Sequence, residues 1–177
     1  YHVCGAKQDA GSSCGPVRIA GGGGRGGGGG GGGRGGAPAS PYAEFYGVAG
    51  GESGYVASNP LDPEITYGGN YRGVLQMQNR RTGLGERLDP WPLNPMGHDA
   101  ADSKYRFQWT YPIMNSPHDP HVLYAGGNVL FKSGDDGKTW AIISPDLTRH
   151  DPRTLGSSGG PITKDQTSVE YYATIFA

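Results

Sequence analysis

The chain lacks any long hydrophobic run and carries almost no net charge, and both absences exclude classes of protein. No stretch approaches the roughly 18 consecutive apolar residues of a membrane-spanning helix, so we expect no membrane span in this segment. The 15 lysines and arginines nearly balance the 16 aspartates and glutamates, which gives a formal net charge of −1. Because a nucleic-acid-binding protein usually presents a strongly basic face, we expect no nucleic-acid partner.

Helical periodicity is also missing, whereas turn-forming residues are abundant. No convincing stretch places apolar residues at the spacing of one helix face. Among 177 residues, 34 are glycine and 14 are proline, spread at turn-like intervals between short apolar patches. This composition predicts an all-β protein built from many short strands.

One run of glycine stands apart from this pattern. Between positions 21 and 36 the only other residues are Arg25 and Arg34, and a proline-containing stretch follows. Polyglycine loses much backbone entropy on ordering and has no side chains to bury, so we interpret residues 21–41 as a flexible surface insertion. An RNA-binding tract is the alternative, but two arginines supply little phosphate affinity.

The clearest strand prediction covers residues 104–111, where aromatic and polar residues alternate. Period two would place the four aromatic side chains on one face, as core or as a stacking platform, and Arg106 and Gln108 on the other. Further strands are expected at residues 1–4, 44–48, 54–57, 65–67, 74–77, 122–124, 129–132, 140–143 and 171–176.

An internal repeat organises the sequence around two Asp-Pro turns, at Asp62-Pro63 and at Asp119-Pro120, 57 residues apart. Both copies fit the frame S-P-x-D-P followed by a strand, with one residue inserted in the first copy. Proline fixes φ and aspartate binds the local backbone, so each Asp-Pro predicts a tight turn before a half-buried strand.

The second copy continues into residues 133–140, which match S-x-D-x-G-x-T-W at every defined position. This segment resembles an Asp-box, also called a BNR repeat, which lies on a hairpin between the outer strands of a propeller blade. The chemistry fits a hairpin, since the Asp135 carboxylate can accept backbone N–H bonds and Gly137 can adopt a positive φ. Ser133 and Thr139 can tie the turn together, and Trp140 can bury a large apolar area.

The resemblance extends to most of the chain apart from the glycine run. Residues 1–9, 50–55, 104–110, 143–148 and 159–163 are similar to segments of bacterial sortilin-like proteins, of the vacuolar-protein-sorting receptor type, which are often labelled glycosyl hydrolases. The resemblance implies a fragment of a multi-bladed β-propeller, with two to three four-stranded blades. The units would be 1–20 (the end of a blade), 21–41 (the insertion), 42–110 and 111–171 (two blades), and 172–177 (the start of the next).

The resemblance also implies an exported protein, secreted or in the periplasm or cell envelope. In such an oxidising compartment Cys4 and Cys14, ten residues apart across a turn, would form a disulfide. Two unrelated thiols are the alternative, because the sequence does not supply the distance between them.

Candidate catalytic and metal-binding groups are few. Asp62, Asp119 and Asp135 are explained as turn residues, but Glu52 precedes a strand and is a weak candidate for catalysis or ligand contact. A sialidase would need an arginine triad, a tyrosine nucleophile with its glutamate partner, and usually an R-I-P element, which residues 17–20 match only in part. Two His/Asp clusters, His98-Asp99 with Asp102 and His118-Asp119 with His121, lack a recognised metal-ligand spacing. We therefore expect no metal and no cofactor.

Two functions remain open. The first is a non-catalytic propeller scaffold that binds a protein, peptide or glycan. The alternative is a glycoside hydrolase acting on polysaccharide, which would require two carboxyl groups across a shared cleft.

Overall fold

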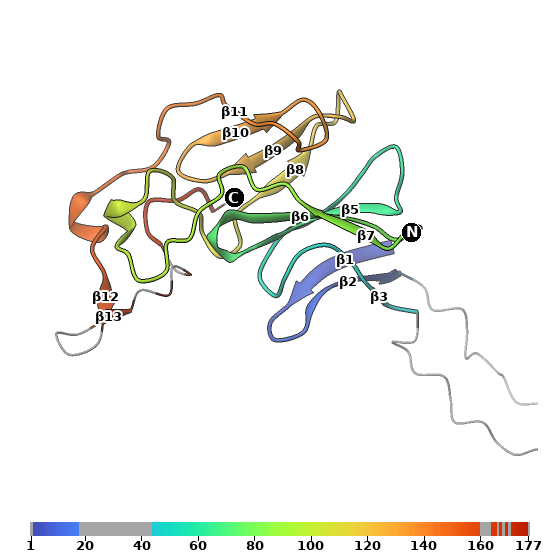
Figure 1. Ribbon diagram of the computed structural model, residues 1–177, viewed down its shortest axis with the longest axis horizontal. Coiled ribbons are helices and arrows are strands. Elements are labelled where there is room, and N and C mark those ends of the chain that lie inside the picture. Colours follow the sequence, from blue (N-terminus) through green and yellow to red (C-terminus); the bar gives the residue numbers. More distant parts are fainter. Residues whose placement is uncertain are drawn as a thin grey trace, which may run out of the picture.

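The computed structural model describes residues 2–17, 44–159, 164–165, 167, 169 and 171–176. This part of the chain is all-β, as the composition predicted (Figure 1). Three 3-10 helices of three residues each, η1 (Tyr71–Gly73), η2 (Ala100–Asp102) and η3 (Pro152–Thr154), interrupt the strands. In the described ranges no helix has both the length and the apolar character needed to cross a bilayer.

The strands form antiparallel sheets in which neighbours along the chain are neighbours in space. The first sheet has the order β1-β2-β3, with β1 (His2–Lys7), β2 (Gly11–Pro16) and β3 (Tyr46–Gly47). The second has β4 (Val56–Ser58), β5 (Ile65–Asn70), β6 (Val74–Asn79) and β7 (Leu84–Arg87). The third has β8 (Ile113–Asn115), β9 (Leu123–Gly126), β10 (Leu130–Ser133) and β11 (Ala141–Ile142). A two-stranded sheet pairs β12 (Ser158–Gly159) with β13 (Lys164–Asp165).

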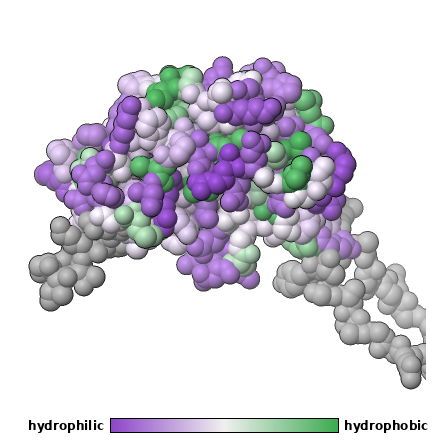
Figure 2. Space-filling model, in the orientation of Figure 1, coloured by the Kyte–Doolittle hydropathy of each residue, from purple (hydrophilic) through white to green (hydrophobic). Residues whose placement is uncertain are grey.

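The three larger sheets follow one another in chain order, from the blue strands to the orange ones in Figure 1. Their first strands lie close together, since β1 is beside β4 and β4 is beside β8. The second and third sheets are therefore two copies of one four-stranded meander, each beginning at the same side of the molecule. Figure 2 shows that the face in view is mainly polar, with hydrophobic residues in small separate patches.

The main core lies between these two copies and is rich in aromatic side chains. Phe107 stacks on Phe131, with ring centroids 5.6 Å apart, and meets the edge of Tyr111 at 5.3 Å. Tyr67 and Leu75 of the second sheet and Leu123 of the third complete the fully buried part of this cluster. Aromatic rings supply large buried area and favour such edge and offset contacts, so they hold successive sheets together.

The strand predicted for residues 104–111 is wrong, because this segment is an irregular crossover between the second and third sheets. Gln108 Oε1 accepts hydrogen bonds from Thr110 N and Thr110 Oγ1, and Tyr111 N donates to Gln108 O, so the chain turns here. The core assignment holds for Tyr105, Phe107 and Tyr111, whose side chains are buried.

Other boundaries also differ from expectation. Strands β2, β7, β12 and β13 were not predicted, and β8 begins after the segment that was predicted. Residues 171–176 are described but form no strand. This C-terminal segment nevertheless contacts the third sheet, since Ile175 N donates to Gly127 O at 2.7 Å. The proposed insertion at 21–41 and the end of the 1–20 unit lie outside the described residues.

Candidate functional site

The two Asp-Pro turns are alike bond for bond. Asn59 Oδ1 accepts from the backbone N–H groups two and three residues later, at 2.8 and 3.2 Å, and Ser116 Oγ does the same at 3.2 and 3.3 Å. The side chains of Asp62 and Asp119 each accept from the N–H two residues on, at 3.1 and 3.0 Å. Both repeat aspartates are therefore occupied in turn formation.

This match corrects the expected alignment of the two copies. Asn59, and not Ser58, is the counterpart of Ser116, since both accept the same pair of backbone hydrogen bonds and both N–H groups close the turn onto Ile65 O and Val122 O. The spacing is 57 residues for these caps as for the aspartates, so the turns contain no insertion. An asparagine amide oxygen and a serine hydroxyl are interchangeable acceptors in such turns.

Each Asp-Pro turn also contacts the hairpin that joins the third and fourth strands of its own sheet. The signs of the paired charges are reversed between the two copies. Arg80 N donates to Glu64 O at 2.8 Å, and the two side chains form an ion pair at 2.9 Å. In the second copy Asp136 N donates to His121 O at 3.0 Å, and Asp136 Oδ2 lies 3.0 Å from His121 Nδ1. The acidic partner is on the turn in one copy and on the hairpin in the other.

The hydrogen bond and the charge of Asp136 raise the pKa of His121. A raised histidine pKa means that this pair stabilises the fold at pH values below the unfolded pKa, and that its contribution is lost as pH rises through the folded pKa. We expect Asp136→Asn to lower the His121 pKa towards its ordinary value, measured by NMR titration of the ring protons. Glu64→Gln, at the equivalent pair of the first copy, is the control. An unchanged His121 titration in Asp136→Asn would refute the pairing.

The 133–140 hairpin is closed by its own side chains. Ser133 Oγ accepts from Gly137 N at 2.8 Å and donates to Asp135 Oδ1 at 2.7 Å. Asp135 then accepts from Thr139 N at 2.9 Å and from Thr139 Oγ1 at 2.7 Å. These bonds from Thr139 and Ser133 lower the pKa of Asp135 to about 2. Hydrogen bonds within its own turn therefore keep the Asp135 carboxyl ionised. Both of its oxygens accept hydrogen bonds in the hairpin, so we assign it a structural role and not one in acid–base chemistry.

The hairpin is packed on the preceding sheet. Trp140 Nε1 donates to Leu88 O at 2.9 Å, and its ring packs against the main core. Gly137, with φ of 90°, fits against the Leu88 side chain, where a Cβ atom would lie 3.0 Å from Leu88 Cδ1. The glycine is thus required both by its backbone conformation and by the close approach. Trp140 and Gly137 therefore join two successive sheets.

A second repeated element, which sequence reasoning missed, follows the fourth strand of each copy. Leu88 N donates to Leu75 O, and Leu75 N donates to Asp89 Oδ1 at 2.9 Å. In the third sheet Ile143 N donates to Leu130 O, and Leu130 N donates to Ser144 Oγ at 2.8 Å. A proline follows the accepting side chain in both copies, so the pairs Asp-Pro at 89–90 and Ser-Pro at 144–145 were the available signal.

Arg106 is almost fully buried, with 3% of its surface exposed, and is the centre of a polar cluster. Its Nη2 donates to Asp146 Oδ2 at 2.8 Å and its Nε donates to Ala173 O at 3.1 Å. Asn128 Nδ2 and Thr148 Oγ1 also donate to the Asp146 carboxylate. Burial opposes ionisation of this carboxyl, but the bonds from Thr148, Asn128 and Arg106 hold its pKa well below the ordinary value. Its position on the second face of the predicted strand made Arg106 a candidate for pore or loop contacts, and its partners Asp146 and Ala173 do lie outside the strands.

Cys4 and Cys14 form a disulfide in the structure. They are directly paired residues of β1 and β2, so the bond crosses the hairpin at its middle. The Cys14 side chain is buried, whereas Cys4 lines an open cavity of about 570 Å³.

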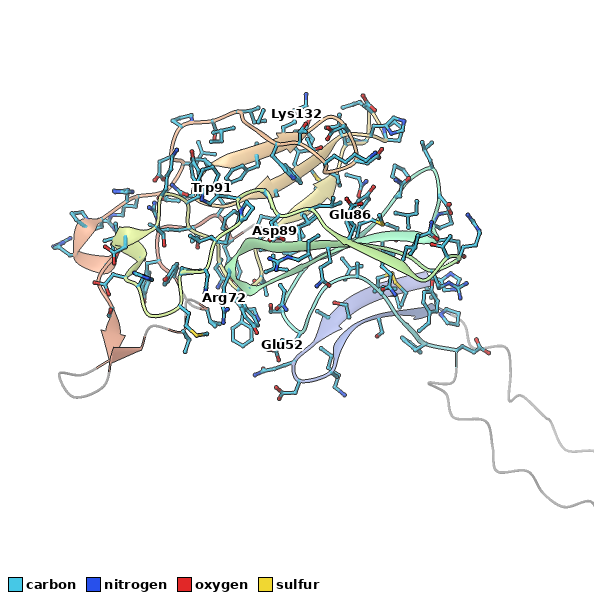
Figure 3. The ribbon with its side chains drawn as sticks, viewed as in Figure 1. Glu52, Arg72, Glu86, Asp89, Trp91 and Lys132 are labelled. Atoms are coloured by element: carbon cyan, nitrogen blue, oxygen red, sulfur yellow. A yellow bond between two sulfur atoms is a disulfide. The ribbon has the colours of Figure 1, made fainter. Side chains whose placement is uncertain are left out.

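That cavity, which we call the Glu52 cavity, collects residues from three parts of the chain. Cys4, Gly5, Ala6 and Gln8 come from the β1–β2 hairpin, Glu52 to Val56 from the approach to β4, and Trp109 and Thr110 from the crossover before β8. Asp9 N donates to Glu52 Oε2 at 2.9 Å, which places the carboxylate beside the hairpin turn (Figure 3). The wall is largely apolar with a few polar groups, as in many ligand sites.

A second cavity, of about 490 Å³, lies between the η2 and η3 region and the C-terminal segment. Its lining includes His98, Asp99, Gln108, Ser157 and Tyr171. Asp99 accepts from Ser157 Oγ, and Tyr171 Oη donates to His98 O at 2.9 Å. These bonds join loops to the C-terminal segment.

None of the three cavities described brings two carboxylates together. The Glu52 cavity, the second cavity and a third cavity along β6 and β7 are each lined by one carboxylate among the described residues, from Glu52, Asp99 and Glu86. Over the described residues there is no group of three or more His, Cys, Asp or Glu side chains suited to a metal ion, and His118 and His121 belong to the second turn.

Comparison with known protein families, with curated proteins and with solved structures finds no match to this chain.

Proposed function

We propose that this chain is part of an exported, sortilin-like β-propeller that binds a protein, peptide or glycan and does not catalyse a reaction on it. The Glu52 cavity is the proposed binding site. The observation that carries the proposal is its construction: residues from three successive sheet units meet there, with exposed aromatic surface and a single carboxylate. Sites of this kind recognise ligands by shape and by a few polar contacts.

The propeller part of the proposal rests on the repeated meander. A Cβ on Gly69 of the second sheet would lie 2.9 Å from Ile113 Cδ1 of the next unit, and a Cβ on Gly126, 57 residues on, would lie 3.2 Å from Ile175 Cγ2. These contacts support a similar placement of the C-terminal segment on the third sheet and of the β8 region on the second. Successive, equivalent contacts are the property of a radial repeat, in which each unit packs on its neighbours.

The family and the compartment belong to the same proposal. The bond network of residues 133–140 supports an Asp-box, because Ser133, Asp135, Gly137 and Thr139 close the turn. A disulfide across an exposed hairpin supports an oxidising compartment such as the periplasm or the cell exterior. In a fold of this type the residues of the binding site, and not those of the structural turns, determine the function.

The hydrolase alternative is less well supported, because a glycosidase of the usual kind needs two carboxyl groups roughly 5–10 Å apart across the substrate. We expect neither the wild-type chain nor Glu52→Gln to release reducing sugar from a panel of plant and bacterial polysaccharides. Retention of ligands by immobilised wild-type protein should fall in Glu52→Gln. Hydrolysis by the wild type that disappears in Glu52→Gln would overturn the non-catalytic proposal.

A further inference from the structure

The charge of Glu52 has no cationic partner in a largely apolar cavity. Its Oε2 accepts from Asp9 N, but across the described part of the chain no lysine, arginine or histidine forms an ion pair with it, and no basic side chain lines the cavity. Glu64 and Asp62, by contrast, have the cationic partners Arg80 and Arg81. A carboxylate with a free oxygen in such surroundings favours a cationic ligand.

The aromatic rings of the cavity also favour a cationic ligand. Elsewhere in the described chain, cations lie over aromatic rings, for example Arg80 over Tyr46 at 4.3 Å and Lys104 over Trp91 at 5.1 Å. Tyr55, which is 41% exposed, and Trp109 have no such cation of the protein over them in the described ranges. Ring faces are attractive to ammonium and guanidinium groups, most strongly where water is partly excluded.

The backbone around the cavity suits an extended peptide. β1 and β4 are both edge strands of their sheets, and both contribute to the lining, through Cys4 to Ala6 and through Val56. An edge strand presents unpaired N–H and C=O groups, to which a peptide backbone can add as a further strand. A glycan would instead need several side-chain partners for its hydroxyl groups, and the wall offers few.

We propose that the Glu52 cavity binds the side chain of an arginine or lysine in an extended peptide segment, with Glu52 contacting the cation and Tyr55 and Trp109 flanking it. This inference rests on the proposed binding function and names its ligand as peptide. Anionic segments are disfavoured in this pocket, because Glu52 repels acidic groups.

The test uses the full 177-residue chain and a dye-labelled, acetylated and amidated pentapeptide with a central arginine, measured by fluorescence polarisation. Matched peptides carry lysine, citrulline, norleucine or glutamate at the centre. We expect the arginine and lysine peptides to bind roughly tenfold or more tightly than the citrulline peptide, and the preference to weaken at high salt.

Single substitutions test the contribution of each side chain to peptide binding. Glu52→Gln should remove the preference for arginine over citrulline, and Tyr55→Leu should weaken arginine binding by roughly threefold to tenfold. Glu44→Gln, an exposed carboxylate outside the cavity lining, should leave binding unchanged. Near-UV circular dichroism confirms that each variant is folded.

Equal affinity for the arginine and citrulline peptides, or an arginine preference that persists in Glu52→Gln, would overturn the inference. Absence of arginine-peptide binding together with glycan retention would also overturn it, while leaving a non-catalytic binding function in place. Hydrolysis of a bound glycan would instead count against the proposed function itself.

Discussion

Replacement of Arg106 by methionine is expected to lower the free energy of unfolding by about 3 kcal/mol, near the low end for breaking a buried ion pair. Methionine retains the apolar stem but removes the guanidinium that donates to Asp146 and to Ala173 O. The Asp146 side chain is 29% exposed, so water can replace part of the hydrogen bonding that its carboxylate loses. The loss of stability is therefore smaller than for a fully buried, unpaired charge.

The matched control is the double variant Arg106→Met with Asp146→Asn. The amide that replaces the Asp146 carboxylate in the double variant carries no charge that could be left unpaired. We therefore expect the unfolding free energy of the double variant, measured by urea denaturation, to be higher than that of Arg106→Met alone. The wild type should also lose stability as pH falls from the ordinary aspartate range, because a depressed pKa contributes stability above the unfolded value and loses it on protonation. Arg106→Met should show a weaker acid dependence; the same dependence in both proteins would contradict this account.

Truncation of Trp140 to alanine is the second large effect, with an expected loss of about 3 kcal/mol of unfolding free energy. The indole packs against the main core and its Nε1 donates to Leu88 O at 2.9 Å, so the variant loses both apolar contact and a bond between sheets. The value is at the low end for an aromatic residue because the ring is partly exposed.

Trp140→Phe separates the two contributions, since it keeps most of the apolar contact and removes the donor. We expect it to cost about 1 kcal/mol, the net value of one hydrogen bond. Leu84→Ala serves as the control for a large apolar residue of the same sheets, because Leu84 is 68% exposed and its loss should change stability by less than about 0.5 kcal/mol. A Trp140→Ala variant as stable as Leu84→Ala would show that the indole does not join the two sheets.

The turns were predictable because their chemistry is local. Asp62 and Asp119 bind backbone N–H groups two residues away, and Ser133 and Asp135 bind within their own hairpin, so sequence spacing alone defines the geometry. Strand β2 was missed for the complementary reason. Apart from Cys14 its sequence consists of glycine, serine and proline, which have low strand propensity, and it is a strand because β1 and β3 pair with it on both sides.

The strand predicted at residues 104–111 is not formed, because the alternation of aromatic and polar residues indicates side-chain burial and not backbone pairing. Tyr105, Phe107 and Tyr111 do enter the core, but Arg106 is buried as well, by partners 40 and 67 residues away. The Glu52 cavity was also beyond prediction, since its walls are brought together from three segments. Long-range placement of this kind leaves no local signature in the sequence.

The reversed ion pairs of the two copies have a consequence for assembly. Because the two meanders share one fold, either turn could in principle dock on the hairpin of the other copy, within one chain or between two chains. Such an exchange would set Glu64 against Asp136 and protonated His121 against Arg80, so both mismatched contacts would bring like charges together. The charge reversal thus discriminates against out-of-order docking of similar repeats, a common failure of repeat proteins.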